Sequence, residues 1–217
     1  YVNVLDPETR LMRPVLNGAW LTPFEPREVN NHYTEANSWQ YSFFAPHDIN
    51  GHIALLGGDE GFDAMLDSLF SASSDTKGRK QVDITGLVGQ YAHGNEPSHQ
   101  TAYLYAYVGK PWKTYEKVRH ILDNLYSSQP DGLCGNDDCG QMSAWYVMSA
   151  IGLYPVTPGS DIYVFSSPVF KNITINLENG RQFVIKSGCK GKIDRNRYIT
   201  SARLNGEDYT RSYIRFS

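Results

Sequence analysis

The sequence has few cysteines, and their number argues against a disulfide framework. Only three occur, Cys134, Cys139 and Cys189, so they cannot all pair with one another. No combination of cysteine and histidine spacings typical of a zinc site is present. A bridge between Cys134 and Cys139 would clamp the loop between them, but free thiols are the expected state.

Long apolar runs and dense basic runs are also missing. No run approaches the ~20 apolar residues of a membrane-spanning helix, so we expect no membrane span. The 20 Lys and Arg are outnumbered by 23 Asp and Glu, giving a formal net charge of −3. This balance argues against sequence-independent binding of nucleic acid. The chain begins at Tyr1 without a signal-type segment and ends within an alternating pattern, so we expect a fragment.

Aromatic residues are abundant, with 15 Tyr and 4 Trp. Their flat faces and polar edges suit sugar binding, although most tyrosines simply pack with one end in water.

Hydrophobic periodicity predicts a helical region up to about Gly152. The expected helices are 28–44, 59–70, 98–108, one starting at Pro111, and 141–151. The last is apolar nearly all round, which is typical of a buried helix. Short loops between successive helices predict antiparallel helical hairpins, as in part of a barrel or bundle.

After Pro155 the period changes to two, which indicates strands. Residues 173–177 and 183–185 flank Asn179-Gly180 and predict a β-hairpin. A second hairpin is expected around Asn205-Gly206. We therefore divide the chain into a helical region, 1–154, and a β-sandwich-like region, 155–217.

Three clusters of polar residues are candidates for chemistry, and the first is the loop before helix 141–151. Asp137 and Asp138 lie in this glycine-punctuated loop. A loop that presents carboxylates at the mouth of a helix can hold a general base or a cation ligand. The alternative is that an Asp caps the helix N-terminus.

The second cluster pairs Glu35 with Trp39, followed by His47 and Asp48. At i and i+4 on a helix, Glu35 and Trp39 would share one face. A carboxyl against an indole loses water, which favours its protonated, proton-donating form. The alternative is a surface Glu beside a core Trp.

The third cluster is the segment 91–99, which contains His93, Gly94, Asn95 and Glu96. Glycine lets the backbone approach a ligand closely, and oxygen ligands from Asn95, Glu96 and nearby carbonyls would suit calcium. Alternatively, Glu96 interacts with the N-terminus of the following helix. His93 and His99 are poorly spaced for zinc.

Together, Glu35 and the Asp137/Asp138 pair supply the acid and the base that glycoside hydrolysis requires. At this point the chain resembles glycoside hydrolase family 92 over nearly its whole length. The blocks that carry the resemblance are 35–41, 46–48, 93–97, 109–114, GNDDCGQMSAWY at 135–146, and 159–161 with Ser167-Pro168 behind it.

The resemblance implies a calcium-dependent, exo-acting α-mannosidase that inverts the anomeric centre. It implies a mostly α fold with a C-terminal β part: the later helical hairpins of an (α/α)6 barrel, followed by part of a β-sandwich-like domain. The remaining N-terminal part of the same enzyme would supply the rest of the barrel, another sandwich and pocket walls. We expect the isolated 217 residues to have little activity.

The resemblance also implies residue roles. Glu35 corresponds to the general acid and Asp138 to the general base, with Asp137 as a supporting carboxylate. Calcium contacts are expected from Gln40, Asn95 and Glu96, and mannose contacts from Trp39, His47, Asp48, His93 and Trp145. This chain has Ala36 where the family commonly has Gly, and Asn136 where some members have a second Asp.

The implied substrate is terminal α-linked mannose, most commonly α-1,2-linked, in N-glycan or mannan-type glycans. The implied location is periplasmic, cell-surface or secreted. Two alternatives stay open: a non-catalytic glycan-binding module, and a different helical-barrel glycosidase or lyase.

Overall fold

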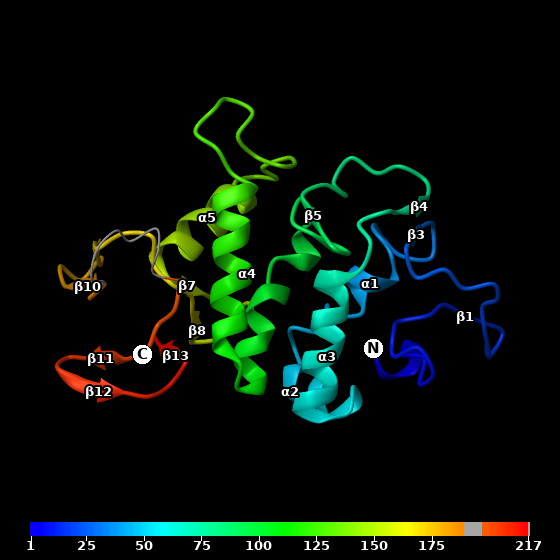
Figure 1. Cartoon of the computed structure of the whole chain (residues 1–217), viewed down its shortest axis with the longest axis horizontal. Helices are drawn as coiled ribbons and strands as arrows, with labels where there is room; N and C mark the ends of the chain where they lie inside the picture. Colours follow the sequence, from blue (N-terminus) through cyan, green and yellow to red (C-terminus); the bar gives the residue numbers. More distant parts are fainter. Residues whose placement is uncertain (189–196, 217) are drawn as a thin grey trace.

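The computed structural model describes residues 1–188 and 197–216, and Figure 1 shows the arrangement of its elements. Cys189 lies outside the described residues. Cys134 and Cys139 are free thiols, as expected. Among the described residues, no helix is long and apolar enough to cross a membrane.

Three long helices confirm predictions made from periodicity. They are α3 (Gly58–Ser71), α4 (Pro111–Asn124) and α5 (Gln141–Ile151), and a shorter helix α2 (Ile49–Leu55) precedes α3. Asp59 and Glu60 lie in the first turn of α3, where negative charge is favourable. Pro111 starts α4, where its missing N–H costs nothing. Helix α4 stands at the centre of the view in Figure 1, and α5 contacts it.

The predicted helix 28–44 is wrong. Only α1 (Ser38–Tyr41) is helical there, and β3 (Glu28–Val29) pairs in parallel with β4 (Lys77–Gly78). Ala36 has φ 61°, which interrupts any helix between β3 and α1. Glu35 therefore precedes the helix, and the expectation that it shares a helix face with Trp39 is also wrong.

The predicted α-helix 98–108 is instead two 3-10 segments, η2 (Glu96–Ser98) and η3 (Thr101–Val108). Tertiary contacts hold η3 on both sides. The hydroxyl groups of Tyr103 and Ser149 lie 2.6 Å apart, and Tyr105 donates to Asp67 at 3.0 Å. Contacts on two sides of one short segment override its local period.

Helix α5 is buried on one side only, contrary to the expectation of a helix enclosed all round. Met142, Trp145, Ser149 and Ala150 are buried, whereas the Val147 side chain is 54% exposed. Trp145 is fully enclosed within an aromatic core whose stacked pairs include Tyr103–Tyr154, at 4.6 Å between ring centroids.

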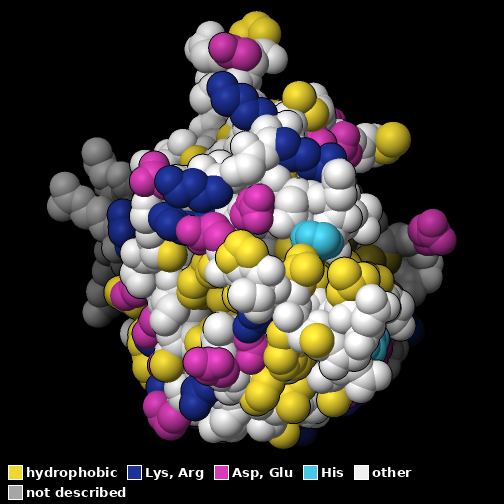
Figure 2. Space-filling model, turned by 90° about the vertical axis from the view of Figure 1, so that its right-hand side faces the viewer, with side chains coloured by type: hydrophobic (Ala, Val, Ile, Leu, Met, Phe, Trp, Pro, Cys, Tyr) yellow, Lys and Arg dark blue, Asp and Glu magenta, His cyan; other side chains and the backbone are white. Residues whose placement is uncertain are grey.

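Short strands frame the N-terminal and middle parts. An opening 3-10 turn precedes two antiparallel hairpins; these elements are η1 (Val2–Val4), β1 (Val15–Leu16), β2 (Ala19–Trp20), β5 (Leu87–Val88) and β6 (Tyr91–Ala92). Figure 2 shows the right-hand side of Figure 1, where hydrophobic side chains gather in the lower part among scattered charges.

The C-terminal part is β-structure. One antiparallel sheet has the order β13-β8-β7, and two hairpins accompany it; the bounds are β7 (Leu153–Tyr154), β8 (Ile162–Phe165), β9 (Asn172–Asn176), β10 (Gln182–Lys186), β11 (Ala202–Leu204), β12 (Glu207–Tyr209) and β13 (Tyr213–Arg215). Both predicted hairpins are confirmed. Asn205 and Gly206 have φ 52° and 91°, as a tight two-residue turn requires.

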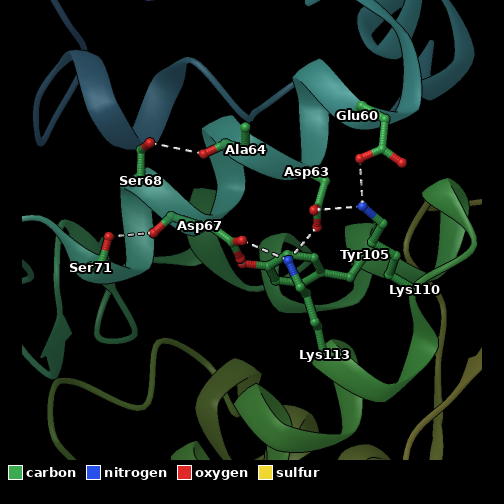
Figure 3. A network of polar contacts seen from close by, with 9 residues as sticks. All are labelled: Glu60, Asp63, Ala64, Asp67, Ser68, Ser71, Tyr105, Lys110 and Lys113. Atoms are coloured by element: carbon green, nitrogen blue, oxygen red, sulfur yellow. Dashed lines mark hydrogen bonds and ion pairs between the residues drawn. The ribbon is translucent and has the colours of Figure 1, made fainter.

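A cluster of charges ties α3 to η3 and α4 (Figure 3). The Asp63 carboxyl, 10% exposed, accepts from Lys110 Nζ at 2.8 Å and from Lys113 Nζ at 2.7 Å. Lys113 also donates to the half-exposed Asp67 at 2.6 Å. Burial alone would raise the pKa of Asp63, but the hydrogen bonds from both lysines outweigh it, so this pKa lies below its ordinary value.

Replacing Asp63 by Asn is expected to destabilise the fold by about 3 kcal/mol, because two lysines then lose their buried counter-charge. Asp67→Asn is the matched control and is expected to cost less than about 1 kcal/mol, since Asp67 is half exposed. Urea unfolding measures both. Because the folded-state pKa of Asp63 is depressed, its contribution is present above the unfolded pKa of about 3.9 and is lost as the pH falls further. Equal destabilisation by the two variants would contradict this assignment.

Candidate active site

Two loops approach each other closely because glycines occupy the contact. A Cβ on Gly94 would lie 2.1 Å from Thr85 Oγ1, and one on Gly135 would lie 3.0 Å from the Gly94 Cα. A Cβ on Gly86 would lie 2.5 Å from Cys134 Sγ. The loop 134–138 therefore packs against the segment 85–96. The glycines here allow the two loops to pack closely against each other. From the sequence alone, glycine in this segment was expected to let the backbone approach a ligand.

Two carboxyl groups, those of Glu96 and Asp138, are in contact where these loops join, and the charge of a third, Glu35, acts on Glu96. Glu96, Asp138 and Glu35 come from three separate segments of the chain. Burial raises the pKa of Glu96, and a hydrogen bond with Asp138 and the charges of Asp138 and Glu35 raise it further. Two carboxyls in hydrogen-bond contact must share a proton or a cation, because like charges at that distance repel. Glu96 therefore lies beside Asp138, the expected base, and feels the charge of Glu35, the expected acid.

The backbone at Asp138 is strained. Asp138, Cys139 and Gly140 have φ 48°, 59° and 92°, so three consecutive residues are left-handed. A non-glycine residue in this region costs roughly 1–2 kcal/mol. Such strain persists only where neighbouring contacts hold it, and it clusters at functional sites.

The N-cap position of α5 is occupied by Gly140 and not by an Asp, but the Asp137 carboxyl still satisfies one N–H of the first turn of this helix. Asp137 Oδ1 accepts from the Ser143 N–H at 2.9 Å, and its carbonyl accepts from the Met142 N–H at 3.2 Å. Asn136 extends the anchor by donating from Nδ2 to Asp83 Oδ1 at 3.0 Å.

His93 and Trp145, expected to contact the sugar, are both completely buried. His93 Nδ1 lies 2.7 Å from the Tyr91 hydroxyl and Nε2 lies 2.6 Å from that of Tyr126, while its ring centroid is 4.4 Å from that of Trp145. Burial, and to a smaller extent the nearby His99, lower the pKa of His93 to about 2, so the ring is neutral. Both rings belong to the buried core against which the loops pack.

The other expected sugar contacts, Asp48, His47 and Trp39, have contacts of their own near the surface or at the edge of the core. Asp48 caps α2, accepting from Gly51 N–H at 2.9 Å, and accepts from the Tyr1 hydroxyl at 2.7 Å. The bond from Tyr1 lowers the pKa of Asp48. The exposed His47 ring packs edge-on against Tyr1, and Trp39 packs half-buried against the core.

The expected calcium ligands differ in how free they are. Gln40 is occupied: Oε1 accepts from Asn37 N–H at 3.3 Å and Nε2 donates to the Gln90 carbonyl at 2.9 Å. Asn95 is completely buried, yet both polar atoms of its side chain lack a partner. Such an orphaned amide is unusual and points to a missing ligand. Asn95 and Glu96 therefore fit a hard cation, whereas the Gln40 side chain already has two partners within the protein.

Among the described residues, no group of three or more His, Cys, Asp or Glu side chains is arranged to hold a metal ion. Any cation here would draw on amide and carbonyl oxygens in addition to carboxylate.

Several contributors were missed by reasoning from the sequence. The Thr85 hydroxyl is buried and unpaired beside Gly94. His99 accepts from the Gln141 side chain at 3.1 Å through Nδ1. Asn37 and Gln40 stand at the spacing of a helix-capping pair, which was the available signal that α1 begins at Ser38.

Comparison with known proteins identifies the family. The model of the glycosyl hydrolase family 92 catalytic domain matches residues 1–217, and the chain belongs to that family.

Two solved structures are similar to nearly the whole chain. The family GH92 alpha-mannosidase BT3965 from Bacteroides thetaiotaomicron, in complex with mannoimidazole, has a TM-score of 0.90 and 39% identity, covering 99% of this chain and 29% of that one. The family GH92 inverting mannosidase BT2199 from Bacteroides thetaiotaomicron VPI-5482 has a TM-score of 0.82 and 39% identity, covering 99% and 30%.

A secreted glycosidase from Arthroderma benhamiae, described as uncharacterized, is 32% identical over 181 residues, which is 83% of this chain and 21% of that protein. The chain therefore spans less than a third of the length of these relatives.

Two substitutions of Asp137 separate its hydrogen bond to the first turn of α5 from its negative charge. Asp137→Ala is expected to lower the free energy of unfolding by about 1 kcal/mol, because the Ser143 N–H loses its acceptor. Asp137→Asn keeps an acceptor oxygen and is expected to remain within about 0.5 kcal/mol of the wild type. Thermal unfolding of both variants tests this. The assignment of this hydrogen bond is wrong if the Asn variant is as unstable as the Ala variant.

Proposed function

We propose that this chain is part of an inverting, exo-acting α-mannosidase that releases terminal α-linked mannose, with α-1,2 linkages as the preferred substrate in N-glycan or mannan-type glycans. The observation that carries the proposal is the contact between Glu96 and Asp138, with the charge of Glu35 acting on Glu96, in a chain of glycosyl hydrolase family 92. The mannosidases among the similar structures support the substrate class.

Glu35 is the proposed general acid and Asp138 the proposed general base. Inversion needs one carboxylic acid to protonate the leaving oxygen and one carboxylate to activate water on the opposite face of the sugar. Their positions on separate loops suit this arrangement, since the sugar has to lie between them. Asp138 stands on the strained turn, which fixes the direction of its carboxyl.

Asp137 has a supporting role in this proposal. One of its oxygens holds the start of α5, and Asp138 follows it directly in the chain. Asn136, where some members have a second Asp, donates to Asp83 and is part of the same anchor. A base shared between two Asp residues is not part of this proposal, because Asn136 has no carboxylate.

Calcium is the proposed cofactor, with Asn95 and Glu96 as the ligands this chain supplies. When bound, it would hold the 2- and 3-hydroxyls of mannose and ease distortion of the ring. The orphaned Asn95 amide and the raised pKa of Glu96 support the assignment, because a cation would pair the amide oxygen and relieve the contact between the carboxyls.

The proposed sugar contacts are revised by burial. His47, Asp48 and Trp39 keep atoms near the surface and remain proposed contacts. His93 and Trp145 are enclosed, so we propose that they act by holding the loops.

The domain division is also a proposal. Residues 1–154 would belong to the later hairpins of an (α/α)6 barrel, and 155–217 to a C-terminal β-region. Pairing of β7 with β8 and the bond from Arg119 to the Pro168 carbonyl at 3.2 Å couple the two parts. The remaining part of the enzyme would complete the pocket. A secreted relative supports a periplasmic, cell-surface or secreted location.

The acid and base assignments make different predictions in the full-length enzyme. Glu35→Gln is expected to lower kcat by about 10²–10⁴-fold on a disaccharide, whose leaving group needs protonation, and far less on an activated aryl mannoside. Asp138→Asn is expected to lower both rates, because both reactions need activated water.

Steady-state kinetics on the two substrates, together with NMR of the first-formed anomer, provide the measurement. Equal losses on both substrates for Glu35→Gln would exclude its acid role. A retained anomeric configuration would exclude inversion. Saturable sugar binding without turnover in the wild type would instead support a glycan-binding module.

Calcium removal is expected to abolish activity of the full-length enzyme, and added calcium to restore it. Asn95→Leu, similar in size, is expected to weaken calcium binding at least tenfold, because it removes an oxygen ligand. Asn95→Asp, which retains that oxygen, is the control. Titration calorimetry and the calcium-dependent rise in unfolding temperature report binding independently of turnover. Unchanged calcium affinity in Asn95→Leu would contradict the ligand assignment.

A further inference from the structure

The short 3-10 segment η2 and the residue after it grip the Asp138 loop at two points. Glu96, at the start of η2, hydrogen-bonds to Asp138. His99, directly after η2, accepts from the Gln141 side chain at 3.1 Å. Asp138 and Gln141 bracket the left-handed turn, so one rigid element contacts both of its ends.

The His99 ring has only one hydrogen-bonding arrangement available to it. The ring is 2% exposed, and Nε2 lies 2.9 Å from the His93 carbonyl oxygen. A carbonyl can only accept, so Nε2 carries the proton and Nδ1 is left as an acceptor for the Gln141 amide N–H. Burial lowers the pKa of His99 to about 4, which keeps this neutral form in place at neutral pH.

Gln141 connects the His99 ring to the backbone of Asp138, the proposed base. It is the first residue of α5, and its N–H donates to the Asp138 carbonyl at 3.3 Å. Between them lie Cys139 and Gly140, both left-handed. Because such a turn is costly for Asp138 and Cys139, contacts at its two ends are needed to keep it from relaxing.

We propose that His99 is a positioning residue: through Gln141 it holds the turn that presents Asp138 to the sugar and to Glu96. This inference rests on the proposed function, in which Asp138 is the base. Displacement of a reacting group by about 1 Å can cost on the order of 10²-fold in rate, so the loss of one such anchor is measurable.

A purely structural role for His99 can be distinguished from positioning of Asp138, because the backbone of His99 makes a structural contact that does not involve its ring. The Trp145 Nε1–H donates to the His99 carbonyl at 3.0 Å, and this bond docks α5 whatever side chain stands at position 99. Substitutions at His99 therefore remove ring contacts and leave this docking bond in place.

Two amide substitutions separate the two ring nitrogens. In His99→Asn, the amide oxygen takes the place of Nδ1 and can still accept from Gln141. In His99→Gln, the amide nitrogen takes the place of Nε2 and keeps the bond to the His93 carbonyl, but the acceptor for Gln141 is lost. The exposed His120, whose ring lies 3.4 Å from the Asn124 side-chain nitrogen, provides the control His120→Gln.

In the full-length enzyme, we expect His99→Gln to lower kcat about 10–100-fold with KM changed less than about threefold. His99→Asn is expected to stay within about threefold of the wild-type kcat, and His120→Gln to equal it. Unfolding temperature and active-site titration show whether the fraction of folded enzyme has changed. Equal kcat losses in both His99 variants, or wild-type kinetics in His99→Gln, would overturn the proposal.

A second variant tests the pathway without altering the buried ring. Gln141 is half-buried, and Gln141→Met removes the donor while filling similar space. We expect Gln141→Met to show the same kcat loss as His99→Gln, and the double variant to lose no more than either single one. Additive losses would overturn the proposal. A wild-type enzyme without mannosidase activity would instead refute the proposed function itself.

Discussion

The site depends on the absence of side chains at the contact between two loops. Gly94 and Gly135 meet so closely that a Cβ on either would collide with its neighbours. This contact brings Asp138 to Glu96, and the segment before α1 adds Glu35. The resulting repulsion between carboxylates is unfavourable for folding, so packing and hydrogen bonds elsewhere must offset it. The buried aromatic support around His93 and Trp145 stands directly behind these loops.

Backbone strain is concentrated on both sides of the proposed reaction centre. Asp138 and Cys139 are left-handed on one side, and Ala36, next to Glu35, is left-handed on the other, with φ 61°. Glycine would adopt this conformation without the steric cost that Ala36 carries. The Ala36 N–H donates to Gln81 Oε1 at 2.6 Å, and this bond helps to hold the strained residue. The proposed acid, Glu35, and the proposed base, Asp138, thus both lie in or next to backbone with left-handed residues.

The local sequence pattern predicted those elements that are determined by their own residues. It failed for elements whose secondary structure is determined by contacts with distant parts of the chain. Helices α3 and α4 were predicted because each buries one periodic face, and Asn205-Gly206 because its turn has its own chemistry. Residues 28–44 failed because Val29 pairs with a strand nearly fifty residues later in the chain. The proposed site residues come from motif resemblance. The His99–Gln141 contact was not predicted, because it joins residues of different elements and no local period marks it. The sequence predicted Val147 to be buried, but the structure exposes it. The chain spans under a third of the length of its relatives.

The surroundings of the three carboxyl groups explain why the proposed acid and the proposed base would take on different roles only when a sugar is bound. Glu35 is only half-buried in this chain, and Asp138 is exposed. A sugar placed between them would exclude water from Glu35, which favours its neutral, proton-donating form. The Asp138 carboxylate would at the same time keep its contact with Glu96, whose raised pKa lets it hold the shared proton. Protonated Glu96, or a cation bound by Glu96, would then stabilise the negative charge of Asp138, so that substrate binding itself would separate the two proposed roles.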